Sequence, residues 1–364
     1  MYLLRKAIEC LVIGRFHASF VGVTSVDQSP ASRMPKKDAK SDPAASSTVR
    51  HLSGSPVRHL SSDDPKEFAA ALTGYESHYL PTTEDHLFTK VELLLPSGRL
   101  VIVRRPPMVF EGVVSANEGL VAFLLDENPR AKINGRLMKA HNITVWKKGT
   151  HYRGYEELPL THCSFLLFDT LCERNWREAM EGSFFSAPRS SFSLRMRIRD
   201  IARVIKGDPT RLMNPNVLEG IDQSVTSGID NALLSAAEVK SSVATARHVL
   251  ICKRAEEYLK ESRYRIFSGV EVAKACGVTI RTLHSALVSV LGMSLNKYIL
   301  LHRLWLTRYA LLQADGEMFV KSIALNHGFW HLGHFSRAYY LRFGELPSET
   351  LANRRSKSGR TPRP

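Results

Sequence analysis

Two short stretches of the chain place hydrogen-bonding side chains along predicted helices that each follow a glycine turn. The first set combines hydroxyl, guanidinium and imidazole groups, at Thr279, Arg281, Thr282, His284 and Ser285. The second set begins 52 residues later and comprises His331, Leu332, Gly333, His334, Ser336 and Arg337. Arginine can donate two hydrogen bonds to guanine, and hydroxyl groups bond bases or phosphates. These residues are therefore candidates for reading the major groove of double-stranded DNA.

The first stretch has the pattern of a helix-turn-helix unit. A short helix is predicted over 269–275, and Gly277 supplies the left-handed backbone that the tight turn needs. Thr279 then caps a second helix with its hydroxyl group. Three apolar residues of that helix are predicted to point inward, namely Ile280, Leu283 and Leu287. The polar residues are left on the outer side, where a DNA groove would lie.

The second stretch repeats this design. It predicts a short helix over 319–325, a turn at 327–329, and a second helix over 331–343 that stops at Gly344 and Pro347. The inward residues of this second helix are Leu332, Phe335 and Tyr339. Trp305 and Trp330 are both expected to be packed between helices.

A long apolar helix is predicted between the two units, from Ser294 to about Gln313. It is apolar on nearly all sides, which is typical of a buried helix. About 20 helical residues span roughly 30 Å, close to the roughly 34 Å of one turn of B-DNA. We therefore expect one molecule to set both recognition helices into successive major grooves.

With these features, the region from about 247 to 351 resembles the DNA-binding domain of the AraC/XylS-type bacterial transcription regulators. The resemblance rests on the doubled unit, on the bridging helix with Arg303-Leu304 and Ala310-Leu311-Leu312, and on a terminal signature. That signature reads Gly328-Phe329, Phe335-Ser336-Arg337, Phe343-Gly344 and Pro347. The resemblance implies an N-terminal sensing and dimerising domain, commonly a small β-barrel, and recruitment of RNA polymerase by an activator.

The family pattern also implies which positions read bases. On the first recognition helix these are Arg281, His284 and Ser285, and on the second they lie near Leu332, Gly333, Ser336 and Arg337. Leu332 and Gly333 depart from the pattern, because neither side chain can make a polar contact with a base. We therefore expect the second helix mainly to hold phosphates through Arg337, Arg342 and its N-terminal N–H groups.

The charge distribution agrees with a polyanionic partner. The 364-residue chain carries a net charge of +15, and residues 247–364 hold 19 Lys/Arg against 8 Asp/Glu, a net of +11. Basic charge thus gathers around the two helix-turn-helix units. The five cysteines show no CxxC spacing, and no run of about 18 apolar residues could span a membrane. A cytoplasmic protein without membrane contact is expected.

Residues 65–172 are predicted to form a β-rich effector or dimerisation domain. Short apolar runs recur there, with turn signals at Pro96-Ser97-Gly98 and Asn134-Gly135. Further strands are predicted over 109–114, 120–125, 143–146 and 164–168. The expected fold class is α+β: an antiparallel, barrel-like N-terminal sensor domain with helices, and an all-α C-terminal domain of two helix-turn-helix subdomains joined by a long helix.

The remaining segments complete the predicted organisation. Residues 1–64 are expected to be a flexible extension with a repeated Val-Arg-His-Leu-Ser motif, and 353–364 a basic tail after the DNA-binding domain at 247–352. Residues 173–246 are predicted to be a helical connector or dimerisation segment, with helices over 175–180, 194–205 and 217–239. An apolar stripe from Leu218 to Leu233 could belong to a core or to a dimer seam.

These features predict a sequence-specific DNA-binding transcription regulator, an activator, that works as a homodimer and responds to an unidentified small-molecule effector. No catalytic residue or cofactor is predicted. Three histidines, His141, His151 and His162, show no metal-ligand spacing, so no metal is expected either. The alternatives are a barrel enzyme with an accessory DNA-binding domain, and a DNA binder that takes no ligand.

Overall fold

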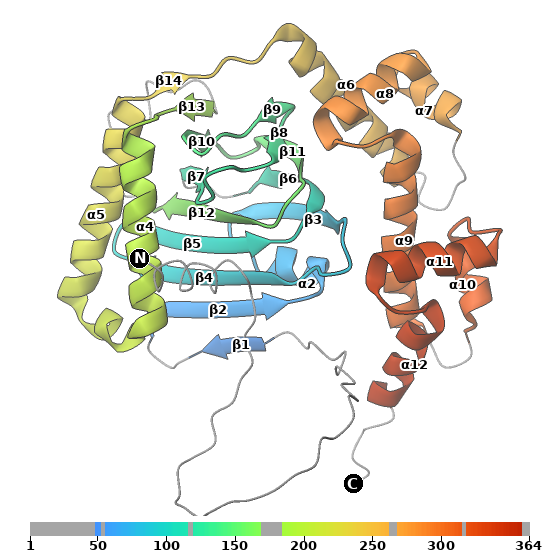
Figure 1. Cartoon of the computed structure of the whole chain (residues 1–364), viewed down its shortest axis with the longest axis horizontal. Helices are drawn as coiled ribbons and strands as arrows, with labels where there is room; N and C mark the ends of the chain where they lie inside the picture. The colour runs from blue at the N-terminus through green and yellow to red at the C-terminus, as the bar shows by residue number, and fades with distance from the viewer. Residues whose placement is uncertain are drawn as a thin grey trace, which may run out of the picture. The chain divides into compact units, whose positions relative to one another are not determined.

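Two antiparallel sheets build the first part of the protein, and helices build the rest (Figure 1). The computed structural model describes residues 48–51, 55–115, 119–168, 184–261, 268–314 and 318–358. The predicted helix over 175–180 lies outside these residues. Ser47–Pro364 forms one unit, and all contacts below lie within it.

The two sheets are separate, so the barrel-like part is not closed. The large sheet contains, in spatial order, β1 (Thr48–His51), β2 (Val57–Ser62), β4 (Phe88–Leu95), β5 (Gly98–Arg105), β12 (Leu160–Leu167), β7 (Leu120–Leu124), β10 (Asn142–Trp146), β13 (Phe184–Ser186) and β14 (Ala237–Glu238). The small sheet contains β3 (Tyr75–Pro81), β6 (Met108–Val114), β11 (His151–Glu156), β8 (Ala131–Ile133) and β9 (Arg136–Leu137). One core joins them, with members from both sheets such as Val103, Phe110 and Tyr152.

Both predicted hairpins are confirmed. β4 pairs with β5 around Ser97, with Leu95 opposite Gly98. β8 pairs with β9 through Asn134 and Gly135, whose φ angles of 49° and 72° are the left-handed pair that a type I′ turn requires. The predicted strands over 109–114, 120–125, 143–146 and 164–168 also lie in β6, β7, β10 and β12.

The repeated motif near the start of the chain forms two paired strands. β1 and β2 are antiparallel, with Val49 opposite Leu60 and Arg50 opposite His59. β2 in turn pairs with β4. The segment expected to be an extension therefore contributes strands from Thr48 onward. Val57 and Leu60, the apolar residues of the second copy, are buried in the sheet.

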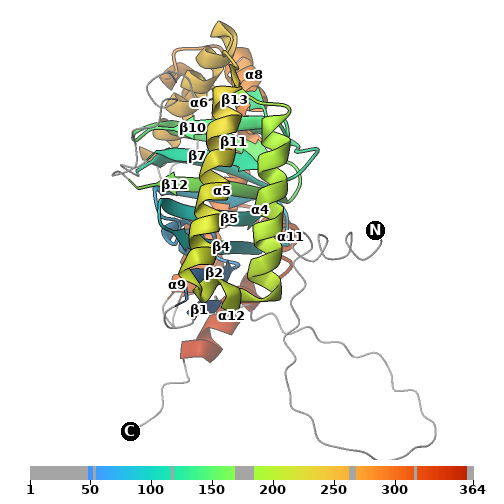
Figure 2. The same cartoon turned by 90° about the vertical axis from the view of Figure 1, so that its left-hand side faces the viewer.

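Two long helices lie across the strands of the large sheet (Figure 2). They are α4 (Ser190–Gly207) and α5 (Pro215–Leu234), joined by the short helix η2 (Pro209–Met213). Val225, Ile229 and Leu233 of the apolar stripe are buried, because α5 packs against α4 and β4. Asp222 on α5 also accepts hydrogen bonds from the backbone N (3.1 Å) and the Oγ (2.5 Å) of Ser97. The stripe is thus used within the chain, which favours the core over the dimer seam.

Helices make up the remainder and confirm the predicted fold class. They are α6 (Val243–Glu261), α7 (Gly269–Ala275), α8 (Ile280–Leu291), α9 (Leu295–Gln313), α10 (Val320–Asn326), α11 (Leu332–Phe343) and α12 (Pro347–Ser358). A short helix, α2 (Pro65–Ala70), precedes β3. Figure 1 shows α7 and α8 near one end of α9, and α10 to α12 near its other end. None of the helices described is long and apolar enough to cross a membrane.

The long helix α9 rests against β3 through a pair of histidines. His302 stacks on His78 with ring centroids 5.3 Å apart, and the neighbouring charged groups are Glu111 and Lys260. Burial, and then the charge of His78, lower the pKa of His302 to about 4, and burial also lowers the pKa of His78. Both rings are therefore neutral at pH 7.

This pair predicts an acid sensitivity of folding. A histidine whose pKa is lower in the folded chain stabilises the fold above its ordinary pKa, and this stability is lost as the pH falls from 6.5 towards 4. Between pH 7 and pH 5 the wild type should lose about 2 kcal/mol more than His302→Phe. Urea unfolding at the two pH values measures this difference, and equal losses in both proteins would contradict it.

Candidate nucleic-acid interface

The first helix-turn-helix unit consists of α7 and α8, and its backbone is held by local caps. Ser268 and Glu271 form a capping box at the start of α7. Gly277 has a φ of +67°, which allows the turn. The Thr279 hydroxyl then accepts a hydrogen bond from the N–H of Thr282 (3.1 Å) and caps α8, as predicted.

The outer side of α8 presents the predicted polar groups to solvent. Arg281, His284 and Ser285 are exposed, as is Thr279, and Thr282 is partly exposed. The inner side is a buried stripe that includes Leu283 and Leu287 and packs against α6 and α7. Ile280 was predicted to point inward, but it is 51% exposed. The buried stripe begins only at Leu283, so the first turn of α8 lies beyond it.

The second unit consists of α10 and α11. Its turn contains Gly328 with a φ of +80°, and α11 ends at Gly344 with a φ of +68°. Phe335, Tyr339 and Phe343 are buried and form a chain of neighbouring rings. The small residue Ala324 on α10 is fully buried, which lets the two helices approach closely.

The outer side of α11 presents fewer exposed polar side chains than that of α8. His331, Gly333, His334 and Arg337 are exposed, and Ser336 is half-buried. Leu332 is half-buried against the core.

One expectation about this unit was wrong. Trp330 is 64% exposed, because it lies in the turn before α11 rather than between helices. Arg342 is half-buried, and its contact with phosphates stays a prediction.

A polar chain that the sequence did not reveal locks α11 to α9 and α12. The Tyr339 hydroxyl is 2.9 Å from Thr350 Oγ1, which donates to Glu345 (2.7 Å). Glu345 also accepts from Arg308 on α9 (2.5 Å). These residues explain part of the terminal signature, because the segment after Gly344 contacts α11 and holds it in place. The sequence shows that Glu345 and Thr350 are close along the chain, but it does not show that the distant Arg308 binds Glu345.

A cavity of about 80 Å³ lies between the two sheets. Its walls are mostly aromatic and include Tyr75, Tyr79, Phe110, Phe123, Trp146 and Tyr152. Two polar residues of its wall, Arg105 and His162, both contact Glu156, with His162 Nε2 2.9 Å from the carboxylate. Burial opposes the charge on Glu156, but Arg105 outweighs it and lowers the pKa of the carboxyl group, while burial and Arg105 lower the pKa of His162. The cluster is therefore an ion pair beside a neutral imidazole.

Metal ligands do not gather in the part of the chain that the structure describes. No group there brings together three His, Cys, Asp or Glu side chains in a way that could hold an ion. His162 is instead held by Glu156, and His151 is an exposed residue at the start of β11.

Comparisons with known proteins match the helix-turn-helix part. A family described as "Helix-turn-helix domain" matches residues 272–353. The XylDLEGF operon transcriptional activator 1 of Pseudomonas putida is 28% identical over 189 residues, which are 51% of this chain and 58% of that protein. A probable thc operon regulatory protein of Rhodococcus erythropolis is 32% identical over 102 residues, 28% of this chain and 31% of that protein. The chain spans less than two thirds of either relative's length.

One solved structure adds a partial likeness. It is a probable AraC family transcriptional regulator from Rhodopseudomonas palustris, 30% identical over 29% of this chain and 96% of that chain, with a TM-score of 0.27. The matched residues 272–353 contain α8 and α11 with the glycine turns that precede them. From this match, and from the operon regulators that share the region, we conclude that residues 272–353 form a helix-turn-helix domain of the AraC/XylS type.

Proposed function

We propose that the protein is a sequence-specific regulator of transcription that binds double-stranded DNA. One observation carries the proposal: a single half-buried helix, α9, joins two helix-turn-helix units whose recognition helices both leave donors exposed. The exposed donors on α8 are Arg281, His284 and Ser285, and those on α11 are His331, His334 and Arg337. Helices of this kind place their N-terminal residues against base edges in the major groove.

The two helices are proposed to divide the work. α8 offers three exposed polar groups on one side of its first two turns and would read bases. The first turn of α11 has Leu332 and Gly333, which offer no polar side chain, and α11 would chiefly hold the phosphate backbone through Arg337. Specificity should therefore come mostly from the first unit.

Arg281→Ala tests this division. Arg281 is exposed in the first turn of α8, where a bidentate contact with guanine is expected. Losing such a contact should cost about 1–3 kcal/mol on the preferred site and relax the choice of base at one position. Binding-site selection from random DNA, followed by titration of the selected duplex, measures both effects.

Arg337→Ala is the matched comparison on α11. It should weaken binding to all sequences alike, because a phosphate contact carries no base information. If Arg281→Ala left the selected sequence unchanged at every position, Arg281 would have no part in base readout. As a separate experiment, genome-wide mapping of the sites that the protein binds would identify the regulated genes.

The other partners are proposed from the resemblance and the fold. Residues 247–352 would be the DNA-binding domain, and 65–172 an effector or dimerisation domain whose cavity between the sheets takes a small molecule. The Pseudomonas putida relatives are transcriptional activators, which supports activation here, and hence contact with RNA polymerase. We also propose that the protein is a cytoplasmic homodimer without catalytic activity. Thermal-shift screening of metabolites tests the effector, because a bound ligand raises the apparent stability.

A further inference from the structure

The two recognition helices correspond position by position. Both are 12 residues long, follow an N-cap residue and end at a glycine with a left-handed backbone. Their N-caps, Thr279 and His331, are 52 residues apart, so the same offset relates every position of α8 to one of α11. Gly333 therefore takes the place in α11 that Arg281 takes in α8. The second helix lacks a side chain where the first has its candidate guanine contact.

The fold gives no reason for a glycine at position 333. Gly333 lies in the first turn of α11, and its backbone is not in the left-handed region that favours glycine. A Cβ atom there would meet no atom of another part of the chain within 4 Å. Glycine destabilises a helix relative to alanine. The missing side chain thus weakens the helix without easing any contact within the protein, which indicates close approach by a partner.

The surface around Gly333 is apolar at the start of α11. Trp330, in the preceding turn, is 64% exposed, and Leu332 is half-buried. Arg337 is exposed one helical turn after Gly333, and hence on the same side of the helix. We call Trp330, Leu332 and Gly333 the apolar tip of α11. The tip offers a large ring and bare backbone, with a cation beyond them.

Thymine in duplex DNA fits this combination. The first residues of a recognition helix meet base edges in the major groove. The C5 methyl of thymine is the apolar group that the base pairs display there. Residues 247–364 carry a net charge of +11, which favours a polyanion over an apolar protein surface as the partner. Arg337 would hold a phosphate while the tip faces the bases.

We propose that α11 reads thymine through apolar contact. The Trp330 indole packs on the C5 methyl group, and the bare backbone at Gly333 lets the helix come close enough for this contact. The inference rests on the proposed function and extends it: α11 holds the phosphate backbone and also adds a preference for thymine that needs no hydrogen bond.

Replacing thymine by uracil tests the contact of Trp330. Each thymine of the duplex that the wild type selects from random DNA is changed in turn, which removes one methyl group and keeps the base pair. At the thymine under Trp330 the wild type should lose affinity about fourfold, the effect of one buried methyl group. Trp330→Ala should show no loss at that position, whereas Trp330→Phe, which keeps a ring, should still show one. Fluorescence anisotropy measures each affinity.

The comparison separates Trp330 from the other exposed apolar residue at the start of a recognition helix, Ile280 on α8, which is 51% exposed. A thymine that Ile280 contacts would stay sensitive to uracil in Trp330→Ala. If every sensitive thymine stayed so in that variant, or if no thymine were sensitive in the wild type, apolar reading by Trp330 would be wrong.

Gly333→Ala tests the close approach. The added methyl group should push the helix away from the bases and weaken binding to the selected duplex by about tenfold. Stability in urea should not fall, because alanine favours the helix. Gly220→Ala is the matched control, since Gly220 is also an exposed helical glycine, in α5, with no atom within 4 Å of a Cβ. That control should bind as the wild type does, and equal affinity in Gly333→Ala would disprove the close approach.

The same measurements tell the two failures apart. A wild type that selects no sequence from random DNA would sink the proposed function, and the apolar reading with it. A wild type that selects an operator, but binds it equally well with uracil at every thymine and with alanine at position 333, would sink the apolar reading alone.

Discussion

Replacing Trp305 by alanine should destabilise the helix-turn-helix region by about 3–5 kcal/mol, the usual cost of truncating a large buried aromatic residue. Trp305 is 2% exposed and lies where three elements meet. Its ring centroid is 5.0 Å from that of Phe343 on α11 and 5.4 Å from that of His86 in the sheet region. Its indole N–H also donates to Pro81. Alanine leaves a cavity at this junction and an unpaired carbonyl group.

Urea unfolding followed by circular dichroism measures the effect, and Trp330→Ala is the matched control. Trp330 is 64% exposed, so its truncation should change the free energy of unfolding by less than about 0.5 kcal/mol. DNA binding should also fail in Trp305→Ala at temperatures where the wild type still binds. Equal stability of the two variants would show that α9 does not depend on this junction.

The two tryptophans also show how far local patterns can predict the structure. The recognition helices, their caps at Thr279 and Gly344, and the bridging helix were all predicted, because each depends on residues within one or two turns. Trp330 was expected to be packed between helices. It is exposed because it falls in a turn, between the buried faces of α10 and α11. Side-chain size predicts burial only where the register of the helix is known.

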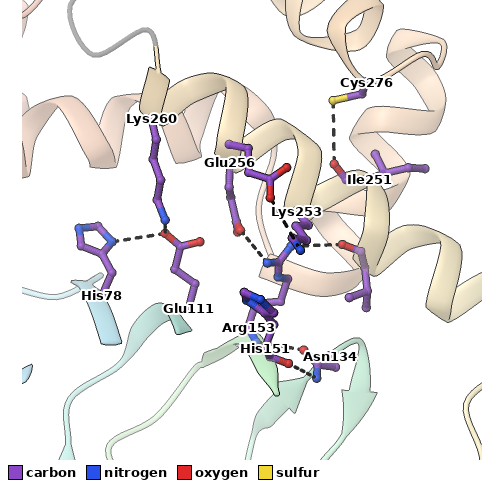
Figure 3. Close-up of polar contacts among 12 residues, drawn as sticks. His78, Glu111, Asn134, His151, Arg153, Ile251, Lys253, Glu256, Lys260 and Cys276 are labelled. Atoms are coloured by element: carbon purple, nitrogen blue, oxygen red, sulfur yellow. Dashed lines mark hydrogen bonds and ion pairs between the residues drawn. The ribbon is translucent and has the colours of Figure 1, made fainter. Parts of the chain in front are cut away.

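Contacts between distant segments were beyond such patterns. Arg153 and Glu256 are each unremarkable in sequence, and neither lies in a motif. Their pairing, shown in Figure 3, depends on β11 presenting Arg153 outward and on α6 lying across that face. The contact between Arg308 and Glu345 also joins distant segments and could not be predicted from a local pattern. The place of β1 in the large sheet likewise depends on its pairing with β2. The candidate DNA contacts were predictable because their positions follow a local motif, whereas the contacts that hold the sheets and helices together depend on long-range packing.

Affinity for the operator should fall steeply with salt. Several cations of the helix-turn-helix region are exposed, including Lys274, Lys297, Lys321 and Arg337. Neutralising a phosphate releases a counterion, so each contact should contribute about −0.9 to the slope of log affinity against log salt. With roughly six to ten contacts, binding should weaken about 10³–10⁵-fold between about 50 and 200 mM salt. Fluorescence anisotropy over a salt series measures the slope.

Arg337→Gln identifies one of these contacts. The slope should become shallower by about 0.9, because one phosphate is no longer neutralised. Arg211→Gln is the control: it removes the same charge from an exposed side chain of η2 in the sheet region, and the slope should not change. A steep slope that is equal in all three proteins would assign phosphate binding to other cations. A flat slope in the wild type would mean that the excess of basic charge around the recognition helices does not serve to hold DNA.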